Sequence, residues 1–486
     1  MDKVYQLMGW LSVGAYWLLV AAVSLRVVLK RRTVGVSAAW LMVIYILPLF
    51  GVGLYLLIGE RNIGRARQRR SAEMADAYRQ WFGQLEQSLH HHQHHLGRHA
   101  HPLHHLCFQQ MGIPATLGNN PTLMQDPKTI FESLLRDIEG ARHTIQMEFY
   151  IWHPGGHADE VAQALIDAAQ RGVEVKLLLD AAGSRDFFKS HWPRQLKEAG
   201  VALIAALEVS PLRMFLRRMD LRQHRKIIVL DHEIAYSGSM NLVDPRFFKQ
   251  KAGVGQWVDV MVRLTGPAVT ALAAIHAWDW ELEGGERALP ELPSGETAPD
   301  PSHISDALQV IPSGPTQPER VIQKVLLLGI YHARRQITLC SPYFVPSEHL
   351  LEALITAAES GIRVELIVPD KNDSMMVDWA SRSYFTELLR AGVKIYRFQG
   401  GLLHTKAVLI DDDHCLIGSV NLDMRSLHLN DEITLALDDP TFCAELQTLM
   451  GHYKGDSYAL DLTIWRQRSL RKKLTEQFFY LFAPLL

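Results

Sequence analysis

Cysteine is scarce in this sequence, which contains only four among its 486 residues. They form no CxxC pair and no cysteine–histidine spacing typical of a zinc site. This argues against a disulfide framework and against a structural metal. We therefore expect the folded part to lie in a reducing compartment and to need no cofactor. The four are Cys107, Cys340, Cys415 and Cys443.

A large excess of positive charge is also missing, since the net charge is -2. Without a broad basic face, nucleic acid is not an expected partner. Hydrophobic residues make up 48% and charged residues 21% of the chain, proportions that suit a folded protein. The length allows two or three domains.

Charged residues are absent from two long stretches near the amino terminus. Residues 4–25 contain none, and at about 1.5 Å per residue in a helix they can cross a bilayer core. A second uncharged run covers residues 33–59. A cleaved signal peptide followed by a buried helix is the alternative, but the first run is too long for one. We predict two transmembrane helices within residues 1–60, and the flanking Arg and Lys residues favour both ends on the cytoplasmic side.

Residues 61–118 resemble a connector in composition. Nine histidines lie between His90 and His105. A metal-binding tract is one interpretation. Because no acid or cysteine lies nearby to complete a site, we favour a basic, His-rich and partly helical linker.

Beyond residue 120 the sequence repeats itself. Residues 164–180 match residues 353–370, and each segment predicts an amphipathic helix, a glycine stop and a buried strand. Alternating strands and helices predict an α/β fold with a parallel or mixed sheet covered by helices. We expect two tandem units, residues 119–283 and 306–486, in a pseudo-two-fold body. Residues 284–305, rich in Pro, Gly and Ser, link them.

One motif occurs once in each unit, in residues 224–241 and in residues 404–421. It has the form H-x-K-x4-D followed by G-S-x-N, and every internal spacing is the same in both copies. A single copy could be a strand that begins with a capping histidine and a solvated lysine. Two copies within an internal repeat are not chance. The matching pairs are His224 and His404, Lys226 and Lys406, Asp231 and Asp411, Gly238 and Gly418, Ser239 and Ser419, and Asn241 and Asn421.

The motif places an imidazole and an ammonium group side by side, because alternate residues of a strand share one face. Lysine binds phosphate oxygens as a point charge, and histidine can be nucleophile, base or acid near neutral pH. Two facing copies would therefore form a phosphate site without a metal, in which lysines supply the positive charge.

This motif is the signature of the phospholipase D superfamily. Two copies behind apolar amino-terminal segments, with "RRMDLRQHRK" and "NLDMRSL", resemble the bacterial type A cardiolipin synthases. The resemblance covers essentially the whole chain. It implies two phospholipase D-like α/β/α units and a two-step transfer through a phosphohistidine.

The resemblance also implies a role for each site residue. His224 would be the nucleophile, and His404 the general acid and then the base. Lys226 and Lys406 would hold the phosphoryl oxygens. Asp231 and Asp411 would shape the site. The remaining candidates bind substrate or orient a histidine: Ser239, Asn241, Ser419, Asn421 and Glu432.

Two segments could contact lipid. Residues 211–226 interleave apolar residues with arginine, which fits anionic headgroups, although a solvated helix reads the same way. The basic and aromatic carboxyl end, residues 466–486, could lie on the bilayer or pack on the catalytic body, and the sequence leaves both open.

We predict a multi-pass enzyme of the bacterial inner membrane, with its catalytic part in the cytoplasm. It would transfer a phosphatidyl group between two phosphatidylglycerol molecules, giving cardiolipin and glycerol. The motif does not decide between an alcohol and water as acceptor, so a phospholipase D-type hydrolase is one alternative. A non-catalytic protein that binds anionic lipid is another. The oligomeric state is left open.

Overall fold

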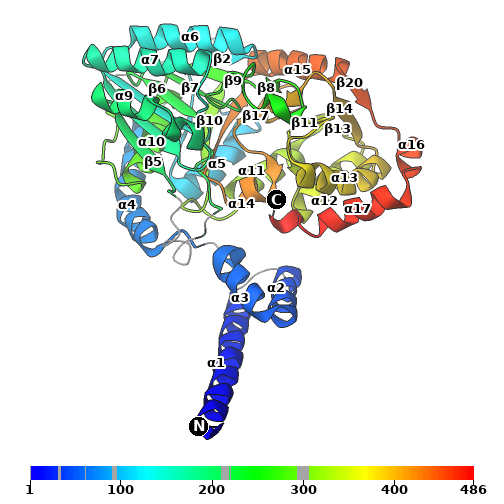
Figure 1. Cartoon of the computed structure of the whole chain (residues 1–486). Helices are drawn as coiled ribbons and strands as arrows, with labels where there is room; N and C mark the ends of the chain where they lie inside the picture. Colours follow the sequence, from blue (N-terminus) through cyan, green and yellow to red (C-terminus); the bar gives the residue numbers. More distant parts are fainter. Residues whose placement is uncertain are drawn as a thin grey trace. The chain divides into compact units, whose positions relative to one another are not determined.

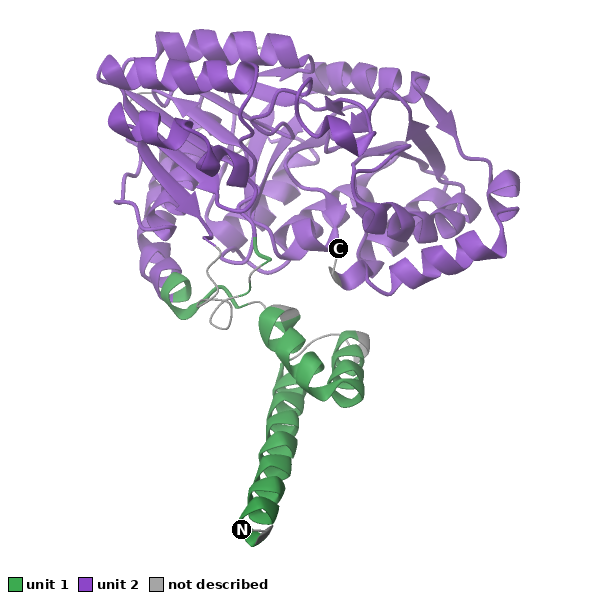
Figure 2. Cartoon of the chain, viewed as in Figure 1, with its two compact units in different colours: residues 1–68, 209–221 green, residues 69–208, 222–486 purple. Residues whose placement is uncertain are grey.

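The computed structural model describes residues 2–30, 34–60, 62–89, 96–208, 218, 220–292 and 306–485. The chain forms two compact units, shown in green and purple in Figure 2. The smaller one contains residues 1–68 and 209–221, and the larger one contains residues 69–208 and 222–486. Both copies of the repeated motif belong to the larger unit.

The smaller unit begins with one long apolar helix, α1 (Asp2–Leu29). The second uncharged run forms two shorter helices, α2 (Val34–Ile46) and α3 (Pro48–Leu54), and a π-helical turn. The break falls at Leu47, whose backbone leaves the helical region because Pro48 follows it. Among the described residues, only α1 is long and apolar enough to cross a membrane. The structure therefore gives one such helix where the sequence predicted two.

The second run packs back on its own neighbours. Buried residues of α1, α2 and α3 form one small core. Gly51 permits the close approach of α3 to α2, because a Cβ there would lie 2.6 Å from the carbonyl oxygen of Val43. Arg26 closes the unit with a hydrogen bond of 2.6 Å to Glu60. The core consists of Val20, Val23, Val27, Ile44, Val52 and Tyr55.

The predicted connector contains two helices, α4 (Arg65–Ser88) and α5 (Ala100–Met111). Trp81, Phe82 and Leu85 of α4 enter the main hydrophobic core, and Leu103 and Cys107 of α5 enter a second one. The predicted partly helical linker thus contains two helices, and their apolar faces are buried in the cores, which the sequence analysis did not predict. Five of the nine histidines, His90, His91, His92, His94 and His95, lie outside the described residues.

The first motif copy lies in a seven-stranded mixed sheet. Its order is β2-β9-β7-β6-β3-β4-β5, and β3, β4 and β5 are parallel while the other pairs are antiparallel. The strands are β2 (Asn120–Met124), β3 (Thr144–Phe149), β4 (Glu174–Asp180), β5 (Ala202–Ala206), β6 (Ile227–Leu230), β7 (Ile234–Gly238) and β9 (Met261–Thr265).

Helices cover both faces of this sheet, as the alternation of β6 shows. Ile228 and Leu230 pack with α6 (Pro127–Gly140) and α7 (His157–Gln170), whereas Ile227 and Val229 pack with α10 (Ala268–Leu282). The chain enters α6 through Asp126, whose carboxylate accepts the N–H of Thr129 at 2.8 Å, and Pro127 follows at the first helical position.

The second copy lies in a nine-stranded mixed sheet with the same central pattern. The order is β1-β10-β19-β17-β16-β11-β13-β14-β20. Figure 1 labels β10, β17, β11, β13, β14 and β20 of this sheet. The strands are β1 (Ala115–Thr116), β10 (Ala307–Ser313), β11 (Gln336–Cys340), β13 (Arg363–Pro369), β14 (Lys394–Phe398), β16 (Ala407–Ile410), β17 (His414–Gly418), β19 (Glu432–Asp438) and β20 (Ser457–Ala459).

The two sheets share one hydrophobic core. It contains α10, α15 (Pro440–Gly455) and residues of β6, β9, β16 and β19. On its other face the second sheet packs against α11 (Val321–His332), α12 (Glu348–Glu359) and α13 (Met375–Arg390). Two short strands, β8 (Trp257–Val258) and β15 (Leu402–Leu403), pair in parallel and join the halves next to His404. This mixed α/β arrangement confirms the predicted fold class of tandem units.

Candidate active site

The two motif histidines lie just before strands β6 and β16, and the opposite half anchors each of them. The backbone N–H of His224 donates to the carbonyl of Asp431 at 2.8 Å. In the same way, the N–H of His404 donates to the carbonyl of Val258 at 2.8 Å. The two segments therefore hold each other in a reciprocal arrangement.

Each imidazole also contacts a buried carboxylate from the other half. Nδ1 of His224 lies 2.7 Å from Oε2 of Glu432, and Nδ1 of His404 lies 2.6 Å from Oδ1 of Asp259. A carboxylate accepts and does not donate, so this contact assigns the proton to Nδ1 of each ring. Nε2 of each histidine then carries the lone pair available for chemistry.

Asp259 is the site residue that the sequence reading missed. The register of the sheets shows its equivalence to Glu432, because Gly238 pairs with Met261 and Gly418 pairs with Thr434. Asp259 and Glu432 each lie two residues before that partner. A search of the first unit for a counterpart of Glu432 at the start of its last strand would have found this aspartate.

The motif serines support these carboxylates and not the histidines directly. Oγ of Ser239 donates to Asp259 at 2.6 Å, and Oγ of Ser419 donates to Glu432 at 2.5 Å. Each serine thus belongs to one half and holds the acid that orients the histidine of the other half. Fixing an acid in this way also fixes the orientation of the ring that it contacts.

The motif lysines are completely buried beside the histidines. Nζ of Lys226 donates to the carbonyl of His224 at 2.7 Å, and Nζ of Lys406 donates to the carbonyl of His404 at 2.6 Å. Burial lowers the pKa of Lys226 to about 7 and that of Lys406 to about 8. Both groups therefore change charge close to neutral pH.

The same burial acts on the histidines and their acids. It lowers the pKa of His224 and of His404 to about 4, against the attraction of their carboxylates. Burial tends to raise the pKa of Glu432 and of Asp259, but the histidine contacts and the lysine charge outweigh it and hold both below the usual range. At neutral pH the rings are thus neutral and the acids ionised, and a bound phosphate anion would favour protonation of a ring.

The two motif asparagines differ from each other. Oδ1 of Asn241 accepts the backbone N–H of Ile151 at 3.2 Å, so it holds a neighbouring loop. Nδ2 of Asn421 donates to Ser426 at 3.3 Å, while its buried Oδ1 has no hydrogen-bond partner among the residues that the structure describes. The structure brings neither into hydrogen-bond contact with a motif histidine.

The motif aspartates lie at the far end of their strands from the histidines. Asp231 follows β6 and accepts the backbone N–H groups of Arg142, His143 and Thr144, each at 2.8 Å. Its φ of 49° is left-handed, a conformation that aspartate tolerates better than most residues. Asp231 thus joins the turn after β6 to the start of β3, and its expected role in shaping the site stays a prediction.

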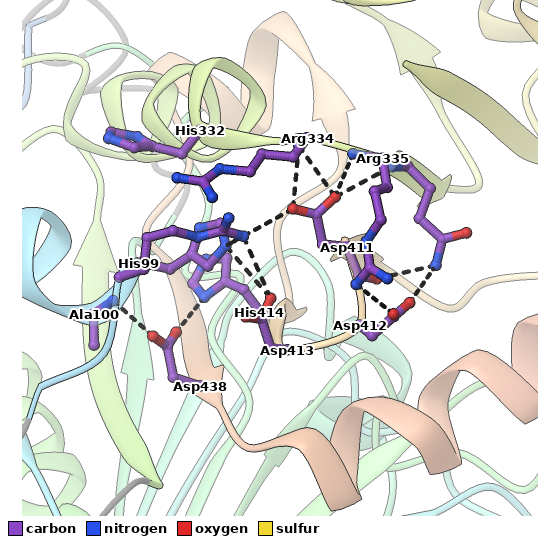
Figure 3. Close-up of polar contacts among 12 residues, drawn as sticks. His99, Ala100, His332, Arg334, Arg335, Asp411, Asp412, Asp413, His414 and Asp438 are labelled. Carbon is purple, nitrogen blue, oxygen red and sulfur yellow. Dashed lines mark hydrogen bonds and ion pairs between the residues drawn. The ribbon is translucent and has the colours of Figure 1, made fainter. Parts of the chain in front are cut away.

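Asp411 repeats this arrangement in the second half (Figure 3). It accepts the N–H groups of Arg334 and Arg335 and has a φ of 52°. In addition, Nη2 of Arg98 donates to its Oδ2 at 2.9 Å. Four strand residues separate either aspartate from its motif lysine, so five steps of about 3.3 Å lie between the two.

The described part of the histidine tract ends beside this aspartate. His99 is buried and stacks on His414 with the ring centroids 4.9 Å apart. His99, Asp411 and Asp413 are close enough to hold a metal ion, but the Arg98 guanidinium lies among them and contacts the first two. The fold thus brings to His99 two acids that the local sequence lacks, together with the Arg98 cation, whose charge opposes a metal ion there.

Only part of the predicted basic lipid-binding stretch, residues 211–226, is described by the structure. Arg213 and Arg217 lie outside the described residues. Arg225 is fully buried, where it pairs with Asp279 and donates to the carbonyl of Glu432 at 3.0 Å. Lipid contact was therefore the wrong expectation for Arg225, which supports the acid that orients His224.

Two α/β halves that exchange acids around paired H-x-K motifs define a tandem phospholipase D-like protein. A solved structure shares this fold: phosphatidylserine synthase from Haemophilus influenzae Rd KW20 has a TM-score of 0.56 and 16% identity, covering 75% of this chain and 93% of that one.

Closer relatives specify the family. The family model "Cardiolipin synthase, PLD-like domain" matches residues 134–265 and 326–453, and "Phospholipase_D-nuclease N-terminal" matches residues 17–60. Cardiolipin synthase A from Yersinia pseudotuberculosis serotype O:3 (strain YPIII) is 50% identical over 486 residues and covers 100% of both chains, and the Yersinia pestis protein gives the same values. The chain belongs to the type A cardiolipin synthase family of the phospholipase D superfamily.

Proposed function

We propose that this protein is a cardiolipin synthase that transfers a phosphatidyl group from one phosphatidylglycerol to another, releasing glycerol. The observation that carries the proposal is the reciprocal pair of histidines, each oriented through Nδ1 by a carboxylate of the other half. One ring can attack phosphorus while the other serves the leaving group, as a two-step displacement requires. Membership of the family supports the same reaction.

In the first step, Nε2 of His224 attacks the phosphorus of phosphatidylglycerol. The P–N bond forms and the bond from phosphorus to the glycerol oxygen breaks. His404 gives its proton to that oxygen, so glycerol leaves as a neutral alcohol. Glu432 stabilises the positive charge that develops on His224, and Asp259 does the same for protonated His404.

In the second step, His404 takes a proton from the terminal hydroxyl of another phosphatidylglycerol. That oxygen attacks phosphorus, the P–N bond breaks, and cardiolipin forms while His224 is restored. Taken together, the two steps exchange one phosphodiester bond for another, so the reaction is reversible and consumes no nucleotide. Lys226 and Lys406 balance the charge on the phosphoryl oxygens.

The identity of the acceptor is tested by incubating purified protein with phosphatidylglycerol labelled in its glycerol headgroup. We expect labelled cardiolipin and free labelled glycerol in equal amounts, with the His224→Ala variant as the inactive control. Phosphatidic acid as the only lipid product would instead show a hydrolase that uses water. Absence of turnover would favour a protein that only binds anionic lipid.

We further propose that α1 and the segment 34–59 both enter the bacterial inner membrane and that both ends of the pair face the cytoplasm. Large apolar side chains such as Leu7, Trp10 and Leu18 are 61%, 76% and 72% exposed on α1, which fits contact with lipid. The break at Pro48 is tolerable in a membrane where neighbouring helices cover the freed backbone groups.

Labelling introduced cysteines from each side of the membrane tests this topology, because the four native cysteines are buried. We expect a cysteine at Lys30 to react only from the periplasmic side and one at Arg65 only from the cytoplasmic side. Reaction of both from one side would mean that one of the two segments does not cross.

The carboxyl end supports a further contact of the larger unit with lipid. Helix α17 (Leu470–Tyr480) packs on α13 through the rings of Tyr384 and Tyr480, whose centroids are 5.5 Å apart. Its other face exposes Leu470, Leu474 and Phe478 next to basic residues. One face of this helix therefore packs on the catalytic body, and the opposite, exposed face suits contact with a bilayer surface.

A further inference from the structure

An ion pair joins the two halves of the larger unit close to His404. Lys249 lies between β7 and β8, and Asp373 lies between β13 and α13. Nζ of Lys249 donates to Oδ2 of Asp373 at 3.0 Å. The other carboxylate oxygen accepts the hydroxyl of Tyr343 at 2.7 Å, so Asp373 is itself held in place. The opposite half therefore sets the position of Lys249, as it does for each motif histidine.

The ammonium group of Lys249 also contacts the indole that lies against His404. Nζ lies 5.3 Å from the centroid of the Trp257 ring, and the centroid of the His404 ring lies 4.3 Å from the same centroid. A cation over an aromatic ring is attracted to it, which restrains the lysine further. Lys249 thus has a defined position near the histidine that we assign to the leaving and the accepting hydroxyl.

Lys249 keeps this position despite backbone strain, and its side chain stays open to solvent. Its φ of 46° is left-handed, a region that is unfavourable for residues other than glycine. The side chain of Lys249 is 45% exposed, whereas that of Asp373 is 7% exposed. An ammonium group has three N–H donors, and among the described residues only Asp373 accepts from this one. Two donors therefore remain for a ligand on the open side.

Exposed apolar side chains flank the ion pair in both segments. Phe247 lies two residues before Lys249, and Met375 lies two residues after Asp373. Such side chains gain free energy when a hydrocarbon group covers them. A ligand with an anionic head and a hydrocarbon part therefore fits this place better than a free anion does.

The proposed reaction brings such a ligand to His404. The accepting phosphatidylglycerol carries a phosphodiester of its own, and only the three carbons of its glycerol headgroup separate that phosphate from the reacting hydroxyl. The motif lysines hold the other phosphate, the one under attack, so the second anion needs a second cation. Arg246, in the same segment as Lys249, is already paired with Asp244 at 2.6 Å. Lys249 is the better placed of the two.

We propose, on the basis of the proposed function, that Lys249 binds the phosphate of the accepting phosphatidylglycerol. It would thereby favour a phospholipid alcohol over water or glycerol as acceptor. Phe247 and Met375 would cover the start of an acyl chain, and Asp373 holds the ammonium group in place. In the reverse reaction, the same lysine would hold the phosphate of cardiolipin that is not attacked.

The test compares two acceptors in one reaction. Full-length protein in detergent micelles receives phosphatidylglycerol together with labelled glycerol, which attacks the phosphohistidine as an acceptor without a phosphate. The ratio of cardiolipin to labelled phosphatidylglycerol is measured, because it does not depend on the fraction of active protein. We expect Lys249→Gln to lower this ratio about 10-fold or more, through the loss of one charged hydrogen bond.

Lys251→Gln is the matched control. Lys251 is an exposed lysine in the short 3₁₀ turn Gln250–Ala252, two residues after Lys249, and its variant should keep the wild-type ratio. An unchanged ratio in Lys249→Gln, or an equal decrease in both variants, would overturn the binding site at Lys249. Wild-type protein that formed no cardiolipin would instead overturn the proposed function, on which this inference rests.

A second pair of acceptors separates the lipid from its headgroup. Glycerophosphoglycerol has the same phosphodiester as phosphatidylglycerol but no acyl chains. With a phosphatidyl p-nitrophenyl ester as donor, Lys249→Gln should raise the KM of both acceptors. Phe247→Ser should raise the KM of phosphatidylglycerol more than that of glycerophosphoglycerol. Equal changes of the two KM values in Phe247→Ser would overturn the role of the apolar side chains.

Discussion

The two copies of the motif use the same contacts at the reacting face but different ones behind it. The residue between His and Lys is Arg225 in the first copy and Thr405 in the second. Arg225 is fully buried and binds Asp279 and the carbonyl of Glu432, whereas Thr405 contacts the hydroxyl of Tyr453 at 3.1 Å. The repeated His and Lys therefore provide the same reactive groups in both halves. The residue between them determines which contacts hold each motif in place.

Buried charge is concentrated behind the first copy. Arg225 lies close to Asp279 and Asp431, and Gln223 donates to Glu148, all of them buried. Burial and the neighbouring Asp279 raise the pKa of Glu148 well above its usual range. The support of the second copy through Thr405 is uncharged. The stability of the first half should therefore depend more strongly on the charges of these buried residues and on the presence of each ion-pair partner.

The largest effect should come from removing either histidine. His224→Ala and His404→Ala should each lower kcat for cardiolipin formation by about 10⁴-fold or more, because nucleophile and acid act in the same reaction. Turnover of labelled phosphatidylglycerol measures this. Substantial activity in either variant would contradict a single site shared by both copies.

The exchanged acids should have the next largest effect. Glu432→Gln and Asp259→Asn should each reduce kcat by about 10²–10⁴-fold, since a neutral amide no longer stabilises the imidazolium. The two should separate in single-turnover experiments: Glu432→Gln slows formation of the covalent intermediate, and Asp259→Asn slows it only with a poor leaving group. Identical behaviour with both kinds of substrate would contradict the division of roles.

Replacement of the central residue compares the two supports directly. Arg225→Leu should destabilise the fold by about 3–5 kcal/mol, because Asp279 is left buried without its partner. Thr405→Val should cost about 1–2 kcal/mol, because the hydroxyl loses its neutral hydrogen bonds with Tyr453 and with the carbonyl of Val258. Urea unfolding of the solubilised protein measures both changes in unfolding free energy. Equal decreases in the two variants would show that the buried charges behind the first copy contribute no more to stability than the uncharged contacts behind the second.

The lysines predict how activity depends on pH. An ammonium group is charged below its pKa, so phosphate binding should weaken as pH rises through about 7 for Lys226 and about 8 for Lys406. We expect KM to rise above pH 8 while kcat changes less, since bound phosphate raises both pKa values. Arginine stays charged, so Lys226→Arg should flatten this rise. A KM that is constant from pH 7 to 9.5 would contradict lowered lysine pKa values.

The smallest effect on chemistry should come from the motif aspartates. Asp231→Asn and Asp411→Asn should lower the free energy of unfolding by about 1–3 kcal/mol with little change in kcat. The reason is that both aspartates bind backbone N–H groups at the end of the strand that is far from the histidine. Asp411→Asn should cost more, since it also loses Arg98. Thermal unfolding and kcat, measured on the same variants, test this prediction. A loss of kcat without a loss of stability would show that the aspartates take part in catalysis.

Much of this arrangement could be predicted from the sequence, because repeats and alternation are local signals. The motif positions and the tandem mixed sheets follow from them, whereas the roles of the site residues, Glu432 included, were expected only from the resemblance to the family. The break at Leu47 was also readable from Pro48. The pairing of His404 with Asp259 was not, because it depends on a contact across 145 residues between two halves.

Contacts formed only in the folded state account for the other differences. Arg225 belongs to a basic stretch in the sequence, but in the fold it is buried and pairs with Asp279 on α10. The helices α4 and α5 look polar in composition, but Trp81, Phe82 and Leu103 provide enough apolar surface to join the cores. Composition over a window does not reveal which single face is buried.

The most direct test of the central claim uses a phosphatidyl ester with p-nitrophenol as leaving group, which departs without a proton. If His224 is the nucleophile and His404 the acid, His404→Ala should release one burst of about one equivalent of nitrophenol per site and retain phosphorus on His224. His224→Ala should release none. A burst from His224→Ala, or equal bursts from both variants, would contradict the assignment of one nucleophile and one acid to the two halves.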